Sequence, residues 1–236
     1  MGKRIIQQRR GKGSPTYRVS KYGYRYGIKY PNKEGKGKVV KLIDSPAHSY
    51  PLAKIRIDGE EFFNPAFNGM AEGQEIEVGG DDVEKGNILA LKDIPLGSRI
   101  YNVERNVNDG GKLIRSGGNS AVITKKEEGR VAVMLPSKKE KWLNEECRAT
   151  IGSIAGQGRL EKPIIKAGNK YKMMKAKGKL WPRTSAVCMN VVDHPLGSGR
   201  GRNPSHGRKG KIPKLNAPAG AKVGSLRPKR TGRKKK

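Results

Sequence analysis

The stretch AKIRIDGEEFFN, residues 53–64, decides the fold class of this 236-residue chain. Ala53 to Ile57 and Glu60 to Asn64 are apolar or alternating runs, the pattern of half-buried strands. Asp58-Gly59 joins them, and this dipeptide favours a two-residue hairpin turn because its residues tolerate positive φ. The stretch therefore predicts two antiparallel strands connected by a tight turn.

Short runs of the same kind continue on both sides of this hairpin. A spacing of roughly ten residues with frequent Gly and Pro is typical of a β-sandwich or a small barrel. We expect an all-β fold with only single helical turns, such as Asn144 to Cys147, and a break at Pro95–Gly97 between two small barrels. The remaining predicted strands are 39–43, 76–78, 88–91, 99–103, 121–124, 130–135, 141–143 and 148–151.

The positive charge of the chain is concentrated at its two ends. The formal net charge is +30, from 51 Lys and Arg against 21 Asp and Glu. Residues 1–41 carry 13 basic residues and one acid, residues 171–236 carry 19 and one, and residues 42–170 carry 19 of each sign. The pattern indicates a neutral globular body with two basic arms, which are too rich in Gly, Pro, Lys and Arg to bury a core. We expect the arms to become ordered on nucleic acid.

Aromatic residues accompany the cations in both arms. Five of the eight tyrosines lie within the first thirty residues, and Tyr22, Tyr24 and Tyr26 have the period of two that places side chains on one face of a strand. These rings either stack on nucleobases or pack back onto the body as a hydrophobic lid. The segment 162–182 predicts a short helix or irregular chain, and its Trp181 is either a core anchor, which we favour, or a stacking platform.

The stretch MNVVDHPLGSGRGR, residues 189–202, has the composition of a segment that contacts phosphate. Glycine allows a backbone to approach another surface closely, and the arginine fork matches two phosphate oxygens. His194 beside Asp193 also suggests a general base, but adjacent residues of an extended chain point in opposite directions. Since no Ser or Cys stands at motif spacing, we predict that His194 donates hydrogen bonds to RNA phosphate or sugar and is not catalytic.

Other classes of chemistry find little support in the sequence. The glycines of 197–201 do not match a G-x-G-x-x-G fingerprint, and no GK[ST] loop occurs. Cys147 and Cys188 lie far apart without a CxxC pair, so we expect no zinc site and no cofactor. No apolar run resembles a signal peptide or a membrane span, and we expect a cytoplasmic protein. An RNA-acting enzyme that uses His194 and a DNA-compacting basic protein remain as alternatives.

Four blocks of the sequence resemble the universal ribosomal protein L2 family of the large subunit, in its archaeal and eukaryotic-type branch. The blocks are GKRIIQQRRGKGSPTYR (2–18), CRATIGSIAGQGR (147–159), KAGNKYKMMKAKGKLWP (166–182) and LWPRTSAVCMNVVDHPLGSGRGR (180–202). The resemblance implies an OB-like barrel followed by an SH3-like barrel, with long basic extensions. We expect a Tyr-rich N-terminal arm at 1–37, the barrels at 38–94 and 95–170, and a C-terminal extension at 171–236.

The resemblance also implies a function. Members of this family bind large-subunit rRNA near the peptidyl transferase region, contact neighbouring ribosomal proteins and support association with the small subunit and tRNA binding. Their peptide-bond chemistry is RNA-based, although the histidine that matches His194 was once the suspected catalyst. Bacterial members carry a second histidine where this chain has Leu196. We therefore expect no catalytic residue, and we expect RNA contacts from Asp193, His194, Gly197, Gly199, Arg200, Arg202, Lys3, Arg4, Arg9, Arg10, Lys12, Lys175, Lys177 and Lys179.

Overall fold

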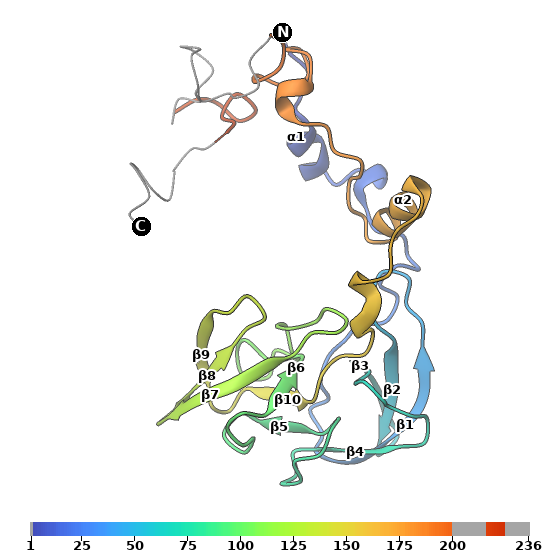
Figure 1. Ribbon diagram of the computed structural model, residues 1–236, viewed down its shortest axis with the longest axis vertical. Helices are drawn as coiled ribbons and strands as arrows, with labels where there is room; N and C mark the ends of the chain where they lie inside the picture. Colours follow the sequence, from blue (N-terminus) through green and yellow to red (C-terminus); the bar gives the residue numbers. More distant parts are fainter. Residues whose placement is uncertain (1, 200–215, 225–236) are drawn as a thin grey trace. The chain divides into compact units, whose positions relative to one another are not determined.

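The computed structural model describes residues 2–199 and 216–224, and most of its regular structure is β-sheet (Figure 1). The helices in this part of the chain are α1 (Ile6–Gly11), α2 (Ala167–Ala176) and the 3₁₀ turns Pro15–Tyr17, Gln157–Leu160 and Ala186–Cys188. The all-β prediction is confirmed, but the expectation of single helical turns alone is wrong, because α2 has ten residues and Asn144 to Cys147 form the end of a strand and a turn. The chain divides into two units, one formed by Met1–Arg18 with Gly178–Lys236 and the other by Val19–Lys177.

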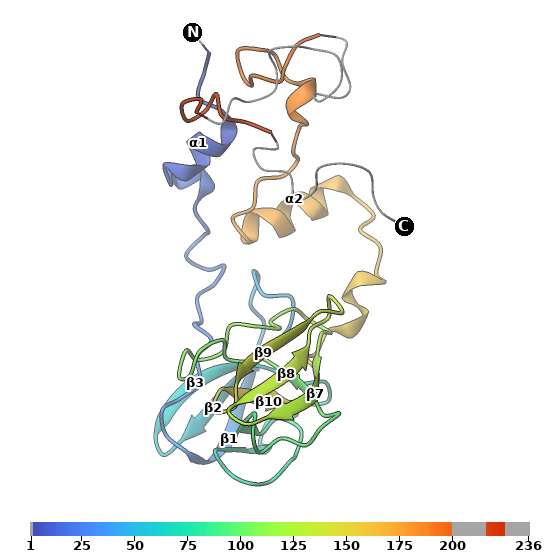
Figure 2. The same cartoon turned by 90° about the vertical axis from the view of Figure 1, so that its left-hand side faces the viewer.

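The second unit holds a ten-stranded sheet with the order β3-β2-β1-β4-β5-β10-β6-β7-β8-β9. Each strand predicted from the sequence overlaps one strand of this sheet. Figure 2 shows β7, β8 and β9 as a meander. The strands are β1 (Gly35–Ile43), β2 (Leu52–Ile57), β3 (Glu60–Pro65), β4 (Glu75–Val78), β5 (Ile88–Ala90), β6 (Arg99–Tyr101), β7 (Ala121–Glu127), β8 (Arg130–Met134), β9 (Glu140–Asn144) and β10 (Arg148–Ile151).

The hairpin predicted from residues 53–64 is the β2–β3 pair. Ile55 lies opposite Phe62 and Ile57 opposite Glu60 in an antiparallel register. Asp58 and Gly59 form the turn with φ values of 43° and 83°, so both central residues have the positive φ of a primed turn. The prediction of the hairpin and its turn is confirmed.

Strand β5 separates two apolar clusters. Ile88 belongs to the first cluster with Val39 and Ile55, and the adjacent Leu89 belongs to the second with Ile100. Successive side chains of a strand point to opposite faces, so this one strand contributes to both cores. Antiparallel pairing of β5 with β10 and of β10 with β6 then carries the sheet from one cluster to the other.

Residues 28–31 are tied to the rest of the second unit by hydrogen bonds. The Tyr30 hydroxyl, which is buried, lies 2.7 Å from both the Asn102 carbonyl oxygen and Thr150 Oγ1. Arg148 Nη1 donates to the Pro31 carbonyl oxygen at 2.7 Å, and Arg115 Nη2 donates to the Ile28 carbonyl oxygen at 3.1 Å. The end of the predicted N-terminal arm is thus part of the folded body.

The tyrosines of this arm do not share the face of one strand, so that expectation is wrong. Residues 21–24 form turns, and Gly23 approaches the helix α2 so closely that a Cβ would lie 2.6 Å from the Ala176 carbonyl oxygen. Tyr26 packs on Phe63 with ring centroids 4.8 Å apart, whereas Tyr22 is 73% exposed. The hydrophobic-lid interpretation therefore holds for Tyr26 and Tyr30 but not for Tyr22.

The first unit has little apolar interior. Ile5, Leu196 and Val223 form a small buried cluster, so the arms bury a few apolar side chains despite their composition. Trp181 is half-buried and belongs to none of the apolar clusters of the described residues, so it is not a core anchor. Neither helix in the described part of the chain is long and apolar enough to span a bilayer.

Candidate nucleic-acid interface

The loop from Met189 to Gly199 is built from tight turns. The amides of Asp193 and His194 both donate to the Asn190 carbonyl oxygen, at 3.0 and 3.1 Å. The Gly197 amide then donates to the His194 carbonyl oxygen at 2.8 Å. These local bonds satisfy the backbone of a segment that lies outside any helix or strand.

Two small residues close the loop on itself. The Ser198 amide donates to the Met189 carbonyl oxygen at 2.8 Å, and Ser198 Oγ accepts from the Val191 amide at 2.9 Å. A Cβ at Gly197 would collide with the carbonyl oxygens of Met189 and Asn190. Gly197 is therefore required by the loop itself.

His194 has a defined tautomer. Its side chain is 5% exposed, and Nδ1 accepts a hydrogen bond from the Leu196 amide at 3.1 Å. Because an accepting Nδ1 carries no proton, the proton of the neutral ring is on Nε2. Burial lowers the pKa of His194 below its usual 6.5. At neutral pH the ring is an uncharged hydrogen-bond donor.

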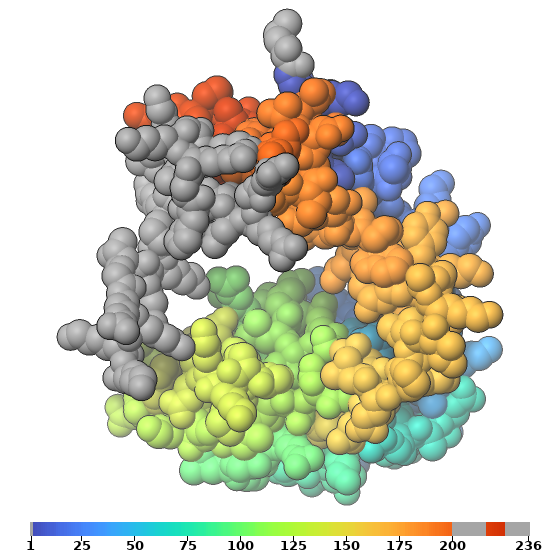
Figure 3. All heavy atoms as spheres, turned by 45° about the horizontal axis from the view of Figure 1, so that its top comes forward, coloured from blue at the N-terminus to red at the C-terminus, as the bar shows by residue number. Residues whose placement is uncertain are grey.

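The N-terminal segment lies along this loop, and the blue and orange spheres of Figure 3 show the two in contact. The Lys3 amide donates to the Val192 carbonyl oxygen at 2.8 Å. Lys3 Nζ lies 3.9 Å from Asp193 Oδ1, in an exposed ion pair. Two predicted RNA-binding residues from opposite ends of the chain are thus brought together.

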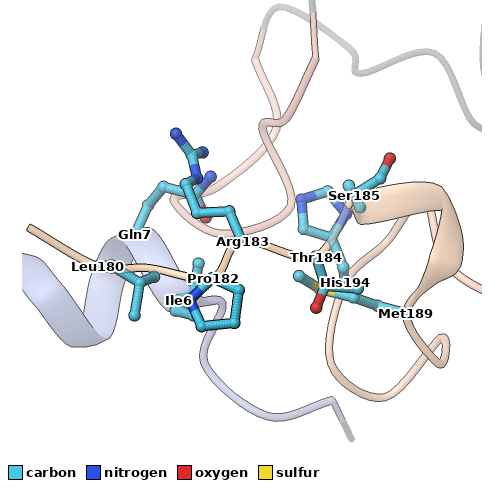
Figure 4. A pocket seen from close by; sticks show the side chains of 10 residues that line it. Ile6, Gln7, Leu180, Pro182, Arg183, Thr184, Ser185, Met189 and His194 are labelled. Carbon is cyan, nitrogen blue, oxygen red and sulfur yellow. The ribbon is translucent and has the colours of Figure 1, made fainter. Parts of the chain in front are cut away.

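A cavity of about 480 Å³ lies between α1 and the segment 180–194 (Figure 4). Ile6, Leu180 and Pro182 contribute apolar surface beside α1, and Met189 contributes it on the side of the loop. The polar lining comes from Gln7, Arg183, Thr184, Ser185 and His194.

The predicted cations have different positions. Arg4, Arg9, Arg10 and Lys12 are exposed in the first unit, as is Lys179. Gly199 ends the described part of the loop with φ of 100°, and Arg200 and Arg202 lie outside the described residues. Lys175 and Lys177 belong to the second unit.

Lys175 lines a second cavity of about 280 Å³, together with Lys172 and the exposed Tyr22. An aromatic ring beside two ammonium groups suits a nucleobase flanked by phosphates. The sequence indicated the rings and the cations separately, but their proximity depends on the contact between α2 and Gly23.

Sequence reasoning missed the cavity-lining residues Gln7, Arg183 and Ser185. No local pattern identifies them, because the cavity joins residues that are more than 170 positions apart in the chain. The single available signal was Ile6 and Leu180, apolar residues within strongly basic segments.

Comparisons with known proteins identify the family of this chain. Residues 84–214 match the family model described as Ribosomal Proteins L2, C-terminal domain. The chain is 43% identical to the large ribosomal subunit protein uL2 of Methanospirillum hungatei over 99% of its length and 100% of the relative. The uL2 proteins of Archaeoglobus fulgidus (43% identity, 98% of this chain and 99% of the relative) and Hyperthermus butylicus (44%, 100% of both) are similar throughout. This chain therefore belongs to the ribosomal protein L2 family, whose fold is an OB-like barrel followed by an SH3-like barrel.

Proposed function

We propose that this chain is a structural, non-enzymatic component of the large ribosomal subunit, and that its basic arms bind rRNA. The observation that carries the proposal is the separation of charge: residues 42–170 are neutral, and the whole excess of +30 lies in the terminal segments. The similar uL2 proteins are named as proteins of the large ribosomal subunit. Within the cytoplasmic ribosome, the partners are rRNA, neighbouring ribosomal proteins and the small subunit.

The first unit offers cations that the described protein leaves without acidic partners. Arg4, Arg9, Arg10 and Lys12 are exposed and form no ion pair among the described residues. The Lys3–Asp193 pair is exposed and long, and a pair of that kind contributes little stability. A phosphate can therefore approach Lys3 with a small loss of internal interaction.

We place the loop 189–199 near the peptidyl transferase region, where the chain supports subunit association and tRNA binding. The boundaries 1–37, 38–94, 95–170 and 171–236 remain our proposal for the domains. They draw support from the two apolar clusters, one containing Val39 and Ile55 and the other Ile123 and Leu143, although Leu89, Leu91 and Ile94 of the range 38–94 pack in the second cluster.

The geometry of His194 supports RNA binding over general-base catalysis. Asp193 forms its ion pair with Lys3, while His194 Nδ1 accepts from the Leu196 amide. No described carboxylate therefore orients the imidazole as in an acid–base dyad. The ring is held as a hydrogen-bond donor through Nε2.

Neutralising Lys3, Arg4, Arg9 and Arg10 with glutamine tests the role of the N-terminal arm. Affinity for large-subunit rRNA should fall, and the slope of log K against log salt concentration should decrease by about one unit for each phosphate that the arm no longer binds. Filter binding between 50 and about 300 mM salt measures this slope.

The matched control replaces four exposed lysines of the neutral body, Lys85, Lys125, Lys139 and Lys162, with glutamine. It removes the same charge and should leave the slope closer to that of the wild type. Equal changes in the two variants would contradict binding through the arm.

His194→Ala tests the non-enzymatic part of the proposal. In large subunits that contain the variant at full occupancy, a single round of peptidyl transfer should stay within a few-fold of the wild-type rate, with any defect in assembly or subunit joining. A loss on the order of 10²–10⁴ in assembled particles is the size expected of a missing acid–base group. That loss would restore the enzyme alternative.

A further inference from the structure

The 480 Å³ cavity of the first unit has a lining suited to a flat ring. Its volume lies within the range of about 300–1,000 Å³ of small-molecule sites. Apolar side chains stand on two sides, Ile6 and Leu180 at α1 and Met189 on the loop (Figure 4). Proteins read unstacked nucleobases by enclosing the ring between apolar side chains and bonding its polar edge.

His194 Nε2 is a hydrogen-bond donor of fixed direction on a residue that lines this cavity. Among the described residues, His194 Nε2 has no hydrogen-bond partner. The atom is also not fully buried, and it belongs to a ring that lines the cavity. Its direction is fixed because the Leu196 amide holds Nδ1 on the other side of the ring.

The charge of the lining disfavours a bare phosphate as the occupant. Arg183 is the single Lys or Arg among the described residues of the lining, and burial keeps the pKa of His194 low, so that the ring is neutral. A phosphate in this cavity would lose water against apolar walls with one cation to compensate. Exposed cations such as Arg9 and Arg10 are a better environment for it.

We propose that this cavity receives one unstacked nucleobase of the rRNA, with a base oxygen or nitrogen accepting a hydrogen bond from His194 Nε2. The proposal rests on the proposed function, since it takes rRNA as the ligand. It assigns a base-reading role to a segment whose charge otherwise indicates only phosphate contacts. His194 and the apolar walls select an exposed base, while the surrounding cations hold the backbone.

Two substitutions separate the two nitrogens of the ring. His194→Asn places an amide oxygen near the position of Nδ1, so the bond from Leu196 is kept and the Nε2 donor is removed. His194→Gln places an amide nitrogen near the position of Nε2 and keeps the donor. Val191→Ala is the matched control, because Val191 belongs to the same loop, is 57% exposed and does not line the cavity.

The test binds each full-length variant to large-subunit rRNA and probes every base with base-specific reagents, with ultraviolet crosslinking in parallel. In the wild type, one nucleotide should be protected at its base edge and crosslinked through its base to a lining residue. The His194→Asn variant should raise reactivity at that base roughly fivefold, the size expected for one neutral hydrogen bond. His194→Gln and Val191→Ala should preserve the protection.

The outcomes distinguish this proposal from the function on which it rests. Crosslinks from the cavity to ribose or phosphate alone, or equal protection in all four proteins, would overturn the base-binding proposal while rRNA binding stands. Loss of protection in His194→Gln equal to that in His194→Asn would also overturn it, because the donor position would then be irrelevant. Failure of the wild type to bind the rRNA would overturn the proposed function itself.

Discussion

Asp193 and His194 are neighbours in the sequence, but their side chains have different partners. Asp193 faces Lys3 from the other end of the chain, and His194 turns its Nδ1 to the Leu196 amide. The sequence led us to expect this divergence from an extended chain, whereas the structure produces it in a tight turn, where the amides of both residues donate to the Asn190 carbonyl oxygen. The role of Gly197 was less visible, since the sequence suggested approach to RNA and the loop itself requires the missing Cβ.

Because His194 is buried, we expect the stability of its loop to depend on pH. Its pKa is lowered in the folded chain, so the unfolded chain binds the proton more readily. The contribution of the neutral, buried ring to the free energy of unfolding is complete at pH values above the unfolded-state pKa of about 6.5. It is lost as the pH falls from about 6.5 through the pKa of the folded state. A nuclear magnetic resonance titration of the ring should give a pKa below 6.5 in buffer and about 6.5 in urea.

The Leu196 amide is an independent measure of the same event. Protonation of Nδ1 removes its acceptor, so protection of this amide against hydrogen exchange should decrease in the same pH range as the ring titrates. Unchanged protection after the ring has titrated would contradict the bond to Nδ1.

At the scale of elements, strand β10 connects Tyr30 and Pro31 to the apolar clusters of the second unit. Thr150 meets the Tyr30 hydroxyl, and Arg148 bonds the Pro31 carbonyl and the buried Glu104. The sequence placed residues 1–37 in an arm. Yet Tyr30 is among the most buried side chains of the described chain, because Thr150 of β10 and Asn102, both distant in sequence, supply partners for its hydroxyl.

Tyr30→Phe tests this connection. The substitution keeps the ring and removes a buried hydroxyl bonded to the Asn102 carbonyl oxygen and Thr150. The free energy of unfolding should fall by about 1–3 kcal/mol, since buried partners are left without their hydrogen bonds. Urea denaturation of the full-length chain measures it.

Tyr22→Phe is the control for Tyr30→Phe, because Tyr22 is 73% exposed. It should change the stability by less than about 0.5 kcal/mol. Equal effects of the two substitutions would show that the Tyr30 hydroxyl does not hold the segment 28–31.

At the scale of the molecule, one sheet serves both apolar clusters. β5 and β10 lie at the centre of the strand order, and Ile88 and Leu89 face different cores. Neither cluster can lose its central strands without exposing apolar surface of the other. The unit Val19–Lys177 should therefore unfold in a single transition.

Ile55→Ala tests this cooperativity. Ile55 is fully buried in the first cluster, and its truncation should cost about 2–5 kcal/mol. Hydrogen exchange of amides in β2 and in the distant β8 should then accelerate by the same free energy. Val40→Ala, at a 40% exposed position, is the control. Acceleration confined to β1–β4 would show that the clusters unfold separately.

The sequence by itself determined the all-β class, the ten strand positions and the β2–β3 turn, because alternation and turn chemistry act over a few residues. It also determined the family and the accumulation of charge in the arms, since these too are properties of short segments and of composition. Only the tertiary structure decided which tyrosines are buried, that β5 serves two cores, and that Ile6 and Arg183 line one cavity with His194. These features depend on contacts between residues far apart in the chain, and such contacts arise from packing and long-range hydrogen bonds that no local pattern encodes.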